Sequence, residues 1–194
     1  MTILHDQHGH RKYLTPAERD AFLNAADESE VREVRTFCAT LAHTGCRISE
    51  ALALTADRID LKDGTIVIES AKKRQTGIYR PIPVPPTLLD MLNLVHDVRA
   101  AHKRRDRGET VRLWDWSRTK GWYVVCAVMM AAKISGPHAT PKGLRHGFGI
   151  KAISCGVPLN TLQQLFGHAQ LSTTSIYADA MGPEKRQLVE RMWR

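Results

Sequence analysis

The chain has 194 residues with 28 Lys or Arg against 20 Asp or Glu, so its formal net charge is +8 and its sequence pI is about 9.6. This length and an apolar content of 43% suit one globular domain with a hydrophobic core, which excludes a disordered or fibrous protein. The longest apolar run, 123–132, is half of the ~20 residues that cross a bilayer, and no secretion signal precedes it, so we expect a cytoplasmic protein without a membrane span.

The first part of the chain is predicted to be helical. Residues 15–18 (TPAE) combine a Thr N-cap, a Pro at the first helical position and a Glu that completes a capping box, which is typical of a helix start. The preceding residues 1–14 are expected to form a polar tail. Apolar residues recur at helical spacing from about Glu30, and Gly45 predicts the end of that helix. A further helix is expected over 48–54.

A small sheet should follow these helices. Asp63-Gly64 is typical of a two-residue hairpin turn between short strands at 59–61 and 66–68. A third strand is expected over 78–84. Because Pro81 and Pro83 have no amide hydrogen for a strand ladder, this strand should be short or lie at the edge of the sheet.

The rest of the chain should be helical apart from one basic loop. A helix that starts at Pro86 leads into residues 99–120, which hold eight Lys or Arg against three acidic residues. This stretch is interpreted either as a solvated face or as a surface that contacts a nucleic-acid backbone. Further helices are expected over 119–134 (buried), 141–156, 158–166, from 172 onwards, and 183–193. The predicted fold class is mainly α with a small antiparallel β-sheet (α+β).

Three groups of residues suggest binding sites but have simpler structural interpretations. The histidines of segment 5–10 could bind a metal, although a mobile tail explains them better. The tryptophans of segment 114–122 could stack on bases, although a hydrophobic anchor for the next helix is favoured. The four cysteines match neither a disulfide framework nor a metal-binding spacing, so we expect reduced thiols and no metal site.

Cationic side chains near two helix starts indicate an anion site. Arg47 follows the break at Gly45, and Lys142 and Arg145 lie one turn apart at the start of a later helix. Helix N-termini attract anions, and an arginine fork matches the geometry of a phosphate. Motifs of nucleotide hydrolases, zinc proteases and α/β-hydrolases do not occur in the sequence.

The order of these motifs resembles that of the tyrosine recombinases, the phage-integrase and Xer-type DNA strand exchangers. Residues 44–50 read TGCRISE, two lysines follow a strand at 72–73, and residues 142–146 read KGLRH. The sequence FGH then occurs at 166–168, and Tyr177 lies nine residues after its histidine. Lys142 departs from the family pattern, which has a histidine at the first position of its H-x-x-R box.

The resemblance implies a tyrosine-recombinase catalytic domain over 15–194, without the N-terminal core-binding domain that usually closes around the duplex. It further implies catalysis without metal, ATP or any other cofactor, with Tyr177 as nucleophile. Lys72 is the expected general acid, with Lys73 as the alternative, and Glu50 should orient an arginine. His146 is expected to form a hydrogen bond within the core. The residues expected to be catalytic are Arg47, Lys72, Lys142, Arg145, His168 and Tyr177.

The expected partner is double-stranded DNA, bound by a homo-oligomer that the resemblance predicts to be a tetrameric synapse. An accessory DNA-binding protein could supply the missing clamp, and without it DNA binding should be weak. Two alternatives remain open, a type IB topoisomerase-like enzyme and a DNA-binding regulator without catalytic activity. The residues expected to contact DNA are Lys73, Arg74, Lys103, Arg104, Arg105 and Arg107.

Overall fold

The computed structural model describes residues 4–70, 77–105, 110–179 and 189–193, with backbone only at 104, 105, 179 and 191. Its elements run in the order α1 (Pro16–Asp27), α2 (Arg32–Thr44), α3 (Ile48–Leu52), η1 (Ala56–Arg58), β1 (Ile59–Asp60), β2 (Thr65–Glu69), β3 (Tyr79–Pro83), α4 (Pro86–His96), α5 (Val98–Arg105), α6 (Arg118–Ala131), α7 (Pro141–Ser154), α8 (Leu159–Phe166), α9 (Ser172–Asp179) and η2 (Arg191–Trp193). The predicted class, mainly α with a small antiparallel sheet, is confirmed. Within the described ranges, no helix has the length and apolar character needed to cross a membrane.

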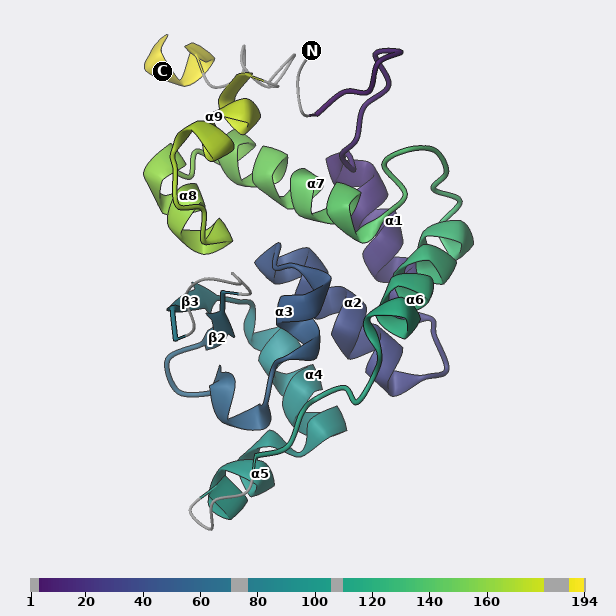
Figure 1. Ribbon diagram of the computed structural model, residues 1–194, viewed down its shortest axis with the longest axis vertical. Coiled ribbons are helices and arrows are strands. Elements are labelled where there is room, and N and C mark those ends of the chain that lie inside the picture. The colour runs from purple at the N-terminus through teal and green to yellow at the C-terminus, as the bar shows by residue number, and fades with distance from the viewer. Residues whose placement is uncertain (1–3, 71–76, 106–109, 180–188, 194) are drawn as a thin grey trace.

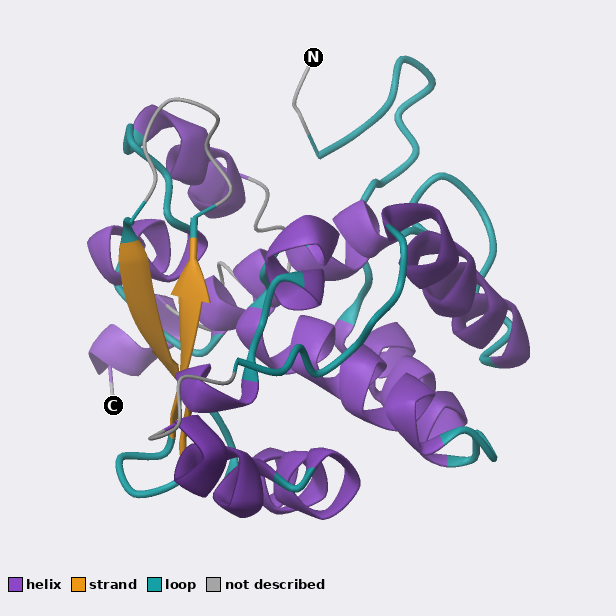
Figure 2. Ribbon diagram, turned by 60° about the horizontal axis from the view of Figure 1, so that its bottom comes forward, coloured by secondary structure: helices purple, strands orange, loops and turns teal. Residues whose placement is uncertain are grey.

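The helices form one body around α2, which packs against α1, α3, α4 and α7. Figure 1 shows α7 crossing the upper part of the molecule, with α8 and α9 stacked against one of its ends. The strands lie at one side of this helical body (Figure 2). The end of α5 lies at the opposite end of the molecule from α9 (Figure 1).

Helix boundaries follow the capping signals in the sequence. The Thr15 hydroxyl accepts a hydrogen bond from the Glu18 amide, and the Glu18 carboxylate accepts one from the Thr15 amide, as the capping box predicts. Gly45 ends α2 in the left-handed conformation, with φ of 60°. A Cβ atom there would lie 2.6 Å from the Phe148 ring and 2.8 Å from the Phe166 ring. Gly45 is therefore required both for the turn and for close packing.

The sheet has the order β1-β2-β3, and both pairs are antiparallel. The third strand lies at an edge, as its prolines predict, and Pro81 and Pro83 point to solvent. The prediction of a two-residue turn at Asp63-Gly64 was wrong. Asp60 pairs with Thr65, so the loop has four residues, because the Asp60 carboxylate accepts hydrogen bonds from the amides of residues 62 and 63.

The prediction of a basic loop over 99–120 was also wrong for its first part, because residues 98–105 form α5. The chain turns at Asp97, which adopts a left-handed φ of 52°, and the Asn93 side chain then accepts a hydrogen bond from the Arg99 amide. Val98 is fully buried at the start of α5. A side-chain cap and one buried apolar residue therefore begin a second helix within a strongly basic stretch.

The N-terminal segment 4–14 is folded against the helices, which corrects the expected mobile tail. Leu4 is fully buried in a cluster with Phe166 and Tyr177. The Lys12 amide donates to the Leu4 carbonyl at 2.8 Å, and the Asp6 carboxylate accepts hydrogen bonds from the amides of residues 8 and 10. In the predicted C-terminal helix, residues 183–188 lie outside the described part, and residues 191–193 form η2.

The structure confirms in part that the tryptophans of segment 114–122 form a hydrophobic anchor for the next helix. Trp114 is 1% exposed, donates its indole N–H to the Glu33 carbonyl at 3.1 Å, and packs edge-on against Phe37. Trp116 packs edge-on against the same ring. Helix α6 is not buried on all sides as expected, because it turns Trp122 and its neighbour Tyr123 to solvent.

Replacing Trp114 with Ala should lower the free energy of unfolding by about 3–5 kcal/mol, because it leaves a large cavity in the core. Trp122→Ala is the matched control and should change stability by less than about 1 kcal/mol, because that side chain is 43% exposed. Urea denaturation followed by circular dichroism measures both values. Equal losses would contradict the assignment of Trp114 to the core.

A buried ion pair joins the sheet to the helices. The Glu50 side chain is fully buried, and its Oε2 lies 2.6 Å from Nη2 of Arg80 in β3. Arg80 also donates to the Ser70 hydroxyl and to the Leu165 carbonyl. Burial alone would raise the pKa of Glu50, but Arg80, the Arg47 amide and the Arg47 guanidinium outweigh it and hold this pKa below its ordinary value.

Glu50→Gln should lower the free energy of unfolding at pH 7 by about 3–5 kcal/mol, because it leaves the Arg80 charge buried without its partner. A lowered pKa means that the Glu50 contribution is present above the unfolded value of about 4.5 and is lost as the pH falls through the folded value. The difference between wild type and variant should therefore shrink in acid. Urea titrations over this pH range measure it, with exposed Glu30→Gln as the matched control. A difference that does not change with pH would contradict the ionised pair.

Candidate active site

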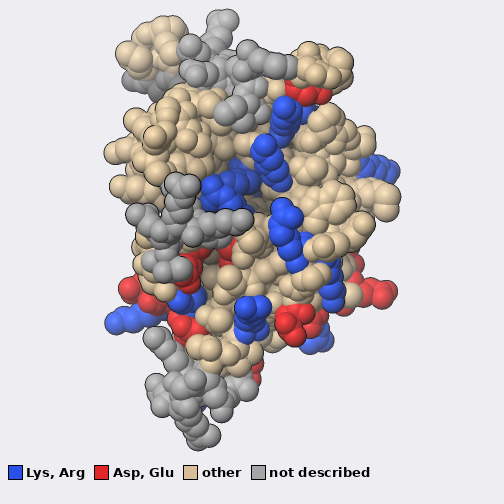
Figure 3. Space-filling view, in the orientation of Figure 1, with Lys and Arg blue, Asp and Glu red and all other residues tan. Residues whose placement is uncertain are grey.

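Five of the residues selected from the sequence border one cavity of about 320 Å³. Arg47 is the N-cap of α3, Lys142 and Arg145 lie in the first turns of α7, His168 follows α8, and Tyr177 lies in α9. Figure 3 shows a band of Lys and Arg side chains down the middle of the face that Figure 1 presents, where this surface is hollowed. The structure thus brings together residues that are up to 130 positions apart.

Arg145 is the most buried cation of this group, with 8% exposure. Its Nη1 donates to the Gly45 carbonyl at 2.6 Å, and its Nη2 donates to the Phe166 carbonyl at 3.0 Å. The guanidinium also lies 4.2 Å from the centre of the Phe166 ring. Burial, reinforced by the charge of Arg47, lowers the pKa of Arg145 to about 10, so it still carries its charge at pH 7.

Arg47 presents a more accessible charge at the same cavity. Its side chain is 39% exposed, and its Nη1 donates to Glu50 Oε1 at 2.8 Å. Because Glu50 also binds Arg80, one carboxylate holds two arginines in place. This agrees with the expectation that Glu50 orients an arginine. Lys142 is exposed at the rim of the cavity, one turn before Arg145.

His168 links Arg145 to α9. Its Nε2 lies 3.2 Å from Arg145 Nη2, and its Nδ1 lies 2.9 Å from the hydroxyl of Thr174. An arginine can only donate, so Nε2 accepts in this arrangement and the ring proton lies on Nδ1, which donates to Thr174. His168 therefore holds the start of α9 against the buried guanidinium.

Tyr177 is 1% exposed, and its ring lies 5.3 Å from that of Phe166. Burial raises the pKa of its hydroxyl to about 12, although Arg145 and Arg47 favour the charged form. The phenol is therefore protonated at neutral pH. Before it can act as a nucleophile, it needs a group that takes its proton.

For His146, the sequence predicted only a hydrogen bond within the core. It is buried and does form a hydrogen bond there, but its partner is the candidate nucleophile, since Nδ1 lies 2.9 Å from Tyr177 Oη. It also lines the cavity. Its spacing of four residues from Lys142, which places both on one face of α7, was the available signal. Burial, with the charges of Lys142 and Arg145, lowers the pKa of His146 to about 4.

Of the remaining selected cations, only the side chain of Lys103 is described, and it does not line this cavity. Lys72, Lys73, Arg74 and Arg107 lie outside the described residues, as do the side chains of Arg104 and Arg105. Lys103 lies in α5, at the opposite end of the molecule from α9 (Figure 1). Among the described residues, no group of three or more His, Cys, Asp or Glu side chains could hold a metal ion.

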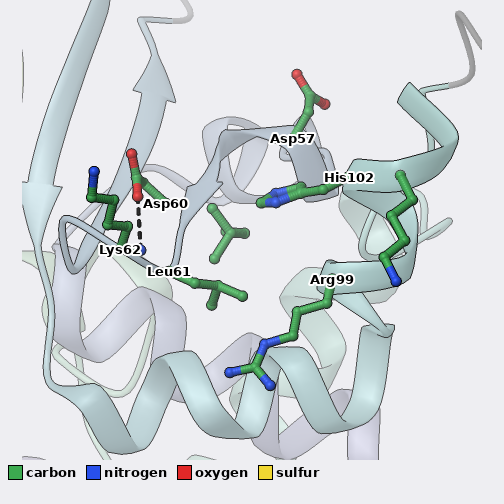
Figure 4. Close-up of a pocket in the computed structure, with 8 residues that line it drawn as sticks. Asp57, Asp60, Leu61, Lys62, Arg99 and His102 are labelled. Carbon is green, nitrogen blue, oxygen red and sulfur yellow. Dashed lines mark hydrogen bonds between the residues drawn. The ribbon is translucent and has the colours of Figure 1, made fainter. Parts of the chain in front are cut away.

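A larger hollow of about 690 Å³ lies between η1, β1 and α5 (Figure 4). Lys103 is part of its lining. Its polar groups support the local fold, because His102 Nε2 contacts the Ala56 carbonyl at 2.9 Å and Asp60 holds the β1–β2 loop. Tyr177 and the arginines Arg47 and Arg145 are not among its lining residues, so the smaller cavity is the candidate active site.

Comparison with curated proteins finds tyrosine recombinases. The tyrosine recombinase XerA of Thermococcus kodakarensis is 30% identical over 195 residues, covering 93% of this chain and 64% of the relative. XerD of Vibrio vulnificus is 27% identical over 184 residues, covering 91% of this chain and 59% of the relative. The chain thus spans about three fifths of the length of these relatives.

Solved structures show the same fold. The crystal structure of XerA recombinase matches with a TM-score of 0.74 at 22% identity, covering 93% of this chain and 64% of that one. The catalytic domain of bacteriophage HP1 integrase matches with a TM-score of 0.66 at 21% identity, covering 92% and 93%. The fold is therefore that of a tyrosine-recombinase catalytic domain. Residues 12–182, which contain every residue of the cavity, match the phage integrase family, and the chain belongs to that family.

Proposed function

We propose that this protein is a site-specific recombinase that cleaves and rejoins duplex DNA through a 3′-phosphotyrosyl intermediate on Tyr177. One observation carries this proposal: Tyr177 lines the same cavity of about 320 Å³ as Arg47, Lys142 and Arg145. A nucleophile beside several cations suits attack on a phosphodiester, whose non-bridging oxygens gain charge in the transition state. In this proposal, residues 15–194 form the catalytic unit.

The proposed reaction balances without an external energy source. The Tyr177 oxygen forms a bond to phosphorus while the bond from phosphorus to the 5′ oxygen breaks. The phenol loses its proton, and the leaving 5′ oxygen gains one from the ammonium of Lys72, with Lys73 as the alternative donor. In the second step, a 5′-hydroxyl attacks the phosphotyrosine and releases Tyr177. The bond energy is conserved throughout, so ATP is not needed.

The cations have distinct proposed tasks. Arg145 and Arg47 would hold the non-bridging oxygens, and Lys142 would donate to the same phosphate from the rim of the cavity. His168 would keep Arg145 and α9 in register through its two ring nitrogens. Loss of one such donor typically costs on the order of 10²–10³ in rate.

We infer that the partner is double-stranded DNA and that recombination requires a homo-oligomer, proposed as a tetramer on two duplexes. The related XerH recombinase has been solved bound to its difH substrate before cleavage, and it shares this fold with a TM-score of 0.74 at 19% identity. An accessory DNA-binding protein would strengthen binding. The residues proposed to contact the DNA backbone are Lys73, Arg74, Lys103, Arg104, Arg105 and Arg107. The proposed location of the protein is the cytoplasm.

Tyr177→Phe should abolish covalent capture of DNA, because phenylalanine lacks the attacking oxygen. The wild type is incubated with nicked duplexes of random flanking sequence, from which the short cleaved fragment diffuses away. Denaturing gels should then show a protein–DNA band for wild type and for the control Tyr123→Phe, whose side chain is 63% exposed on α6. A band that persists in Tyr177→Phe would reject this nucleophile.

DNA recovered from the band identifies the target site and separates the alternative activities. Two copies of that site in one plasmid should yield recombinant products, whereas relaxation of supercoils alone would indicate a topoisomerase-like enzyme. Binding without any covalent band in the wild type would leave only the regulator. EDTA should not reduce the band, and loss of activity on chelation would indicate a metal-dependent phosphodiesterase.

Lys72→Ala should slow cleavage on the order of 10²–10⁴-fold if Lys72 protonates the leaving oxygen. A substrate with sulfur at the 5′ bridging position should restore the rate, because a thiolate leaves without a proton. The same pair of substrates applied to Lys73→Ala is the matched control. Rescue of Lys73→Ala instead would move the general acid to that residue.

A further inference from the structure

We propose that His146 is the general base that removes the phenol proton of Tyr177. This inference rests on the proposed function and adds a residue to it. In α7, His146 directs Nδ1 at the Tyr177 oxygen over 2.9 Å, which is a normal hydrogen-bond distance. His146 therefore touches the atom that would attack phosphorus.

The pair is held rigidly within the fold. His146 is 6% exposed and Tyr177 is 1% exposed, and their rings lie 5.8 Å apart at 48°. Their helices α7 and α9 pack directly against each other. The second ring nitrogen, Nε2, is buried and has no hydrogen-bond partner among the described residues. The contact with Tyr177 is thus the polar interaction that fixes this ring.

The protonation states suit a transfer from the phenol to the imidazole. The pKa of Tyr177 is raised to about 12, so its oxygen carries the proton at pH 7. The pKa of His146 is lowered to about 4, so its ring is neutral and has a lone pair to accept that proton. A phenol that donates to Nδ1 requires the imidazole proton to lie on Nε2.

Lys142 is poorly suited to this task. The family resemblance places a histidine at its position, but a lysine ammonium has three donors and no acceptor. It also lies at the exposed rim of the cavity. In this chain, a histidine one helical turn further along α7 contacts the nucleophile instead. The acceptor role therefore falls to His146, and Lys142 keeps a donor role.

The surrounding charges make this base dependent on the substrate. Burial disfavours an imidazolium at His146, and Lys142 and Arg145 of α7, His168 after α8 and Lys12 of the N-terminal segment add to this effect. Arg47, at the start of α3, lines the same cavity. A phosphodiester in the cavity would bring a negative charge among them and raise the basicity of His146. Tyr177 would then lose its proton only when a phosphate is present to be attacked.

The proton balance is complete. As the bond from Tyr177 to phosphorus forms, the phenol proton moves to His146 Nδ1, and the leaving 5′ oxygen receives a proton from the proposed Lys72 ammonium. In the reverse step, the attacking 5′-hydroxyl returns a proton to that lysine, and the imidazolium of His146 returns one to the departing Tyr177 oxygen. Each residue ends the cycle in its starting state.

The test compares His146→Asn with His146→Ala in single-turnover cleavage of the captured target site. The Asn Oδ1 can accept the phenol hydrogen bond near the position of Nδ1, but it cannot take the proton. Both variants should therefore be slower by on the order of 10²-fold or more, as expected for loss of a general base. A His146→Asn rate within a few-fold of wild type would overturn the proposal and leave a positioning role.

Two further measurements separate the base from a merely structural histidine. The wild-type rate should fall in acid as His146 becomes protonated, whereas His146→Asn should lack this fall. Added imidazole should partly restore His146→Ala, which has space for it. The control His96→Asn alters a half-buried histidine that contacts Thr36 and does not line the cavity, and should cleave normally. An unchanged acid limb in His146→Asn and no imidazole rescue would overturn the proposal.

Failure of the proposed recombinase function and failure of the general-base role of His146 give different results. Circular dichroism and DNA binding establish that each variant is folded. If the wild type forms no covalent band, the proposed function fails and this inference fails with it. If the wild type forms the band and His146→Asn forms it at the same rate, only the general base is rejected.

Discussion

The site depends on one buried guanidinium. Arg145 donates to the carbonyls of Gly45 and Phe166, which lie at the C-terminal ends of α2 and α8. Carbonyls at a helix C-terminus have no partner within the helix and carry partial negative charge, so a buried cation between two such ends is stabilised by both. The same contacts fix α7 against α2 and α8. An arginine that binds phosphate would thus also hold the three helices together.

The electrostatics of the cavity follow from this arrangement. Glu50 balances part of the charge of Arg47 and Arg80, but its carboxylate is turned toward them and is fully buried. Arg145 and Lys142 add further positive charge to the cavity that Tyr177 also lines. The lowered pKa values of Arg145 and His146 both report this excess of positive charge, in addition to burial. An anion bound among these cations would relieve the repulsion, so the cavity favours anions electrostatically.

Local signals in the sequence predicted much of the fold. The capping box at Thr15, the left-handed Gly45 and the prolines of β3 each act within a few residues, and each was found where expected. The side-chain contacts that close the loop after Asp60 and that begin α5 after Asp97 were missed, because no standard sequence motif marks them.

The candidate site was predictable in its members but not in its connections. Motif order selected Arg47, Lys142, Arg145, His168 and Tyr177, and the structure places all five at one cavity. Their partners depend on tertiary contacts between distant segments. Burial of Leu4 beside Tyr177 and the hydrogen bond between Tyr177 and His146 arise from packing that no local pattern encodes.

The sequence of α7 shows why the nucleophile can lie so close to its neighbours. Glycine within a helix costs about 1 kcal/mol relative to alanine, yet α7 contains Gly143, Gly147 and Gly149. A Cβ atom at Gly149 would lie 2.6 Å from the Tyr177 ring, and one at Gly147 would lie 2.7 Å from the Leu14 carbonyl. The Tyr177 ring therefore packs on the backbone of α7, one turn from His146. Gly149 lowers the intrinsic stability of α7, but it allows the close approach that brings the Tyr177 hydroxyl to His146.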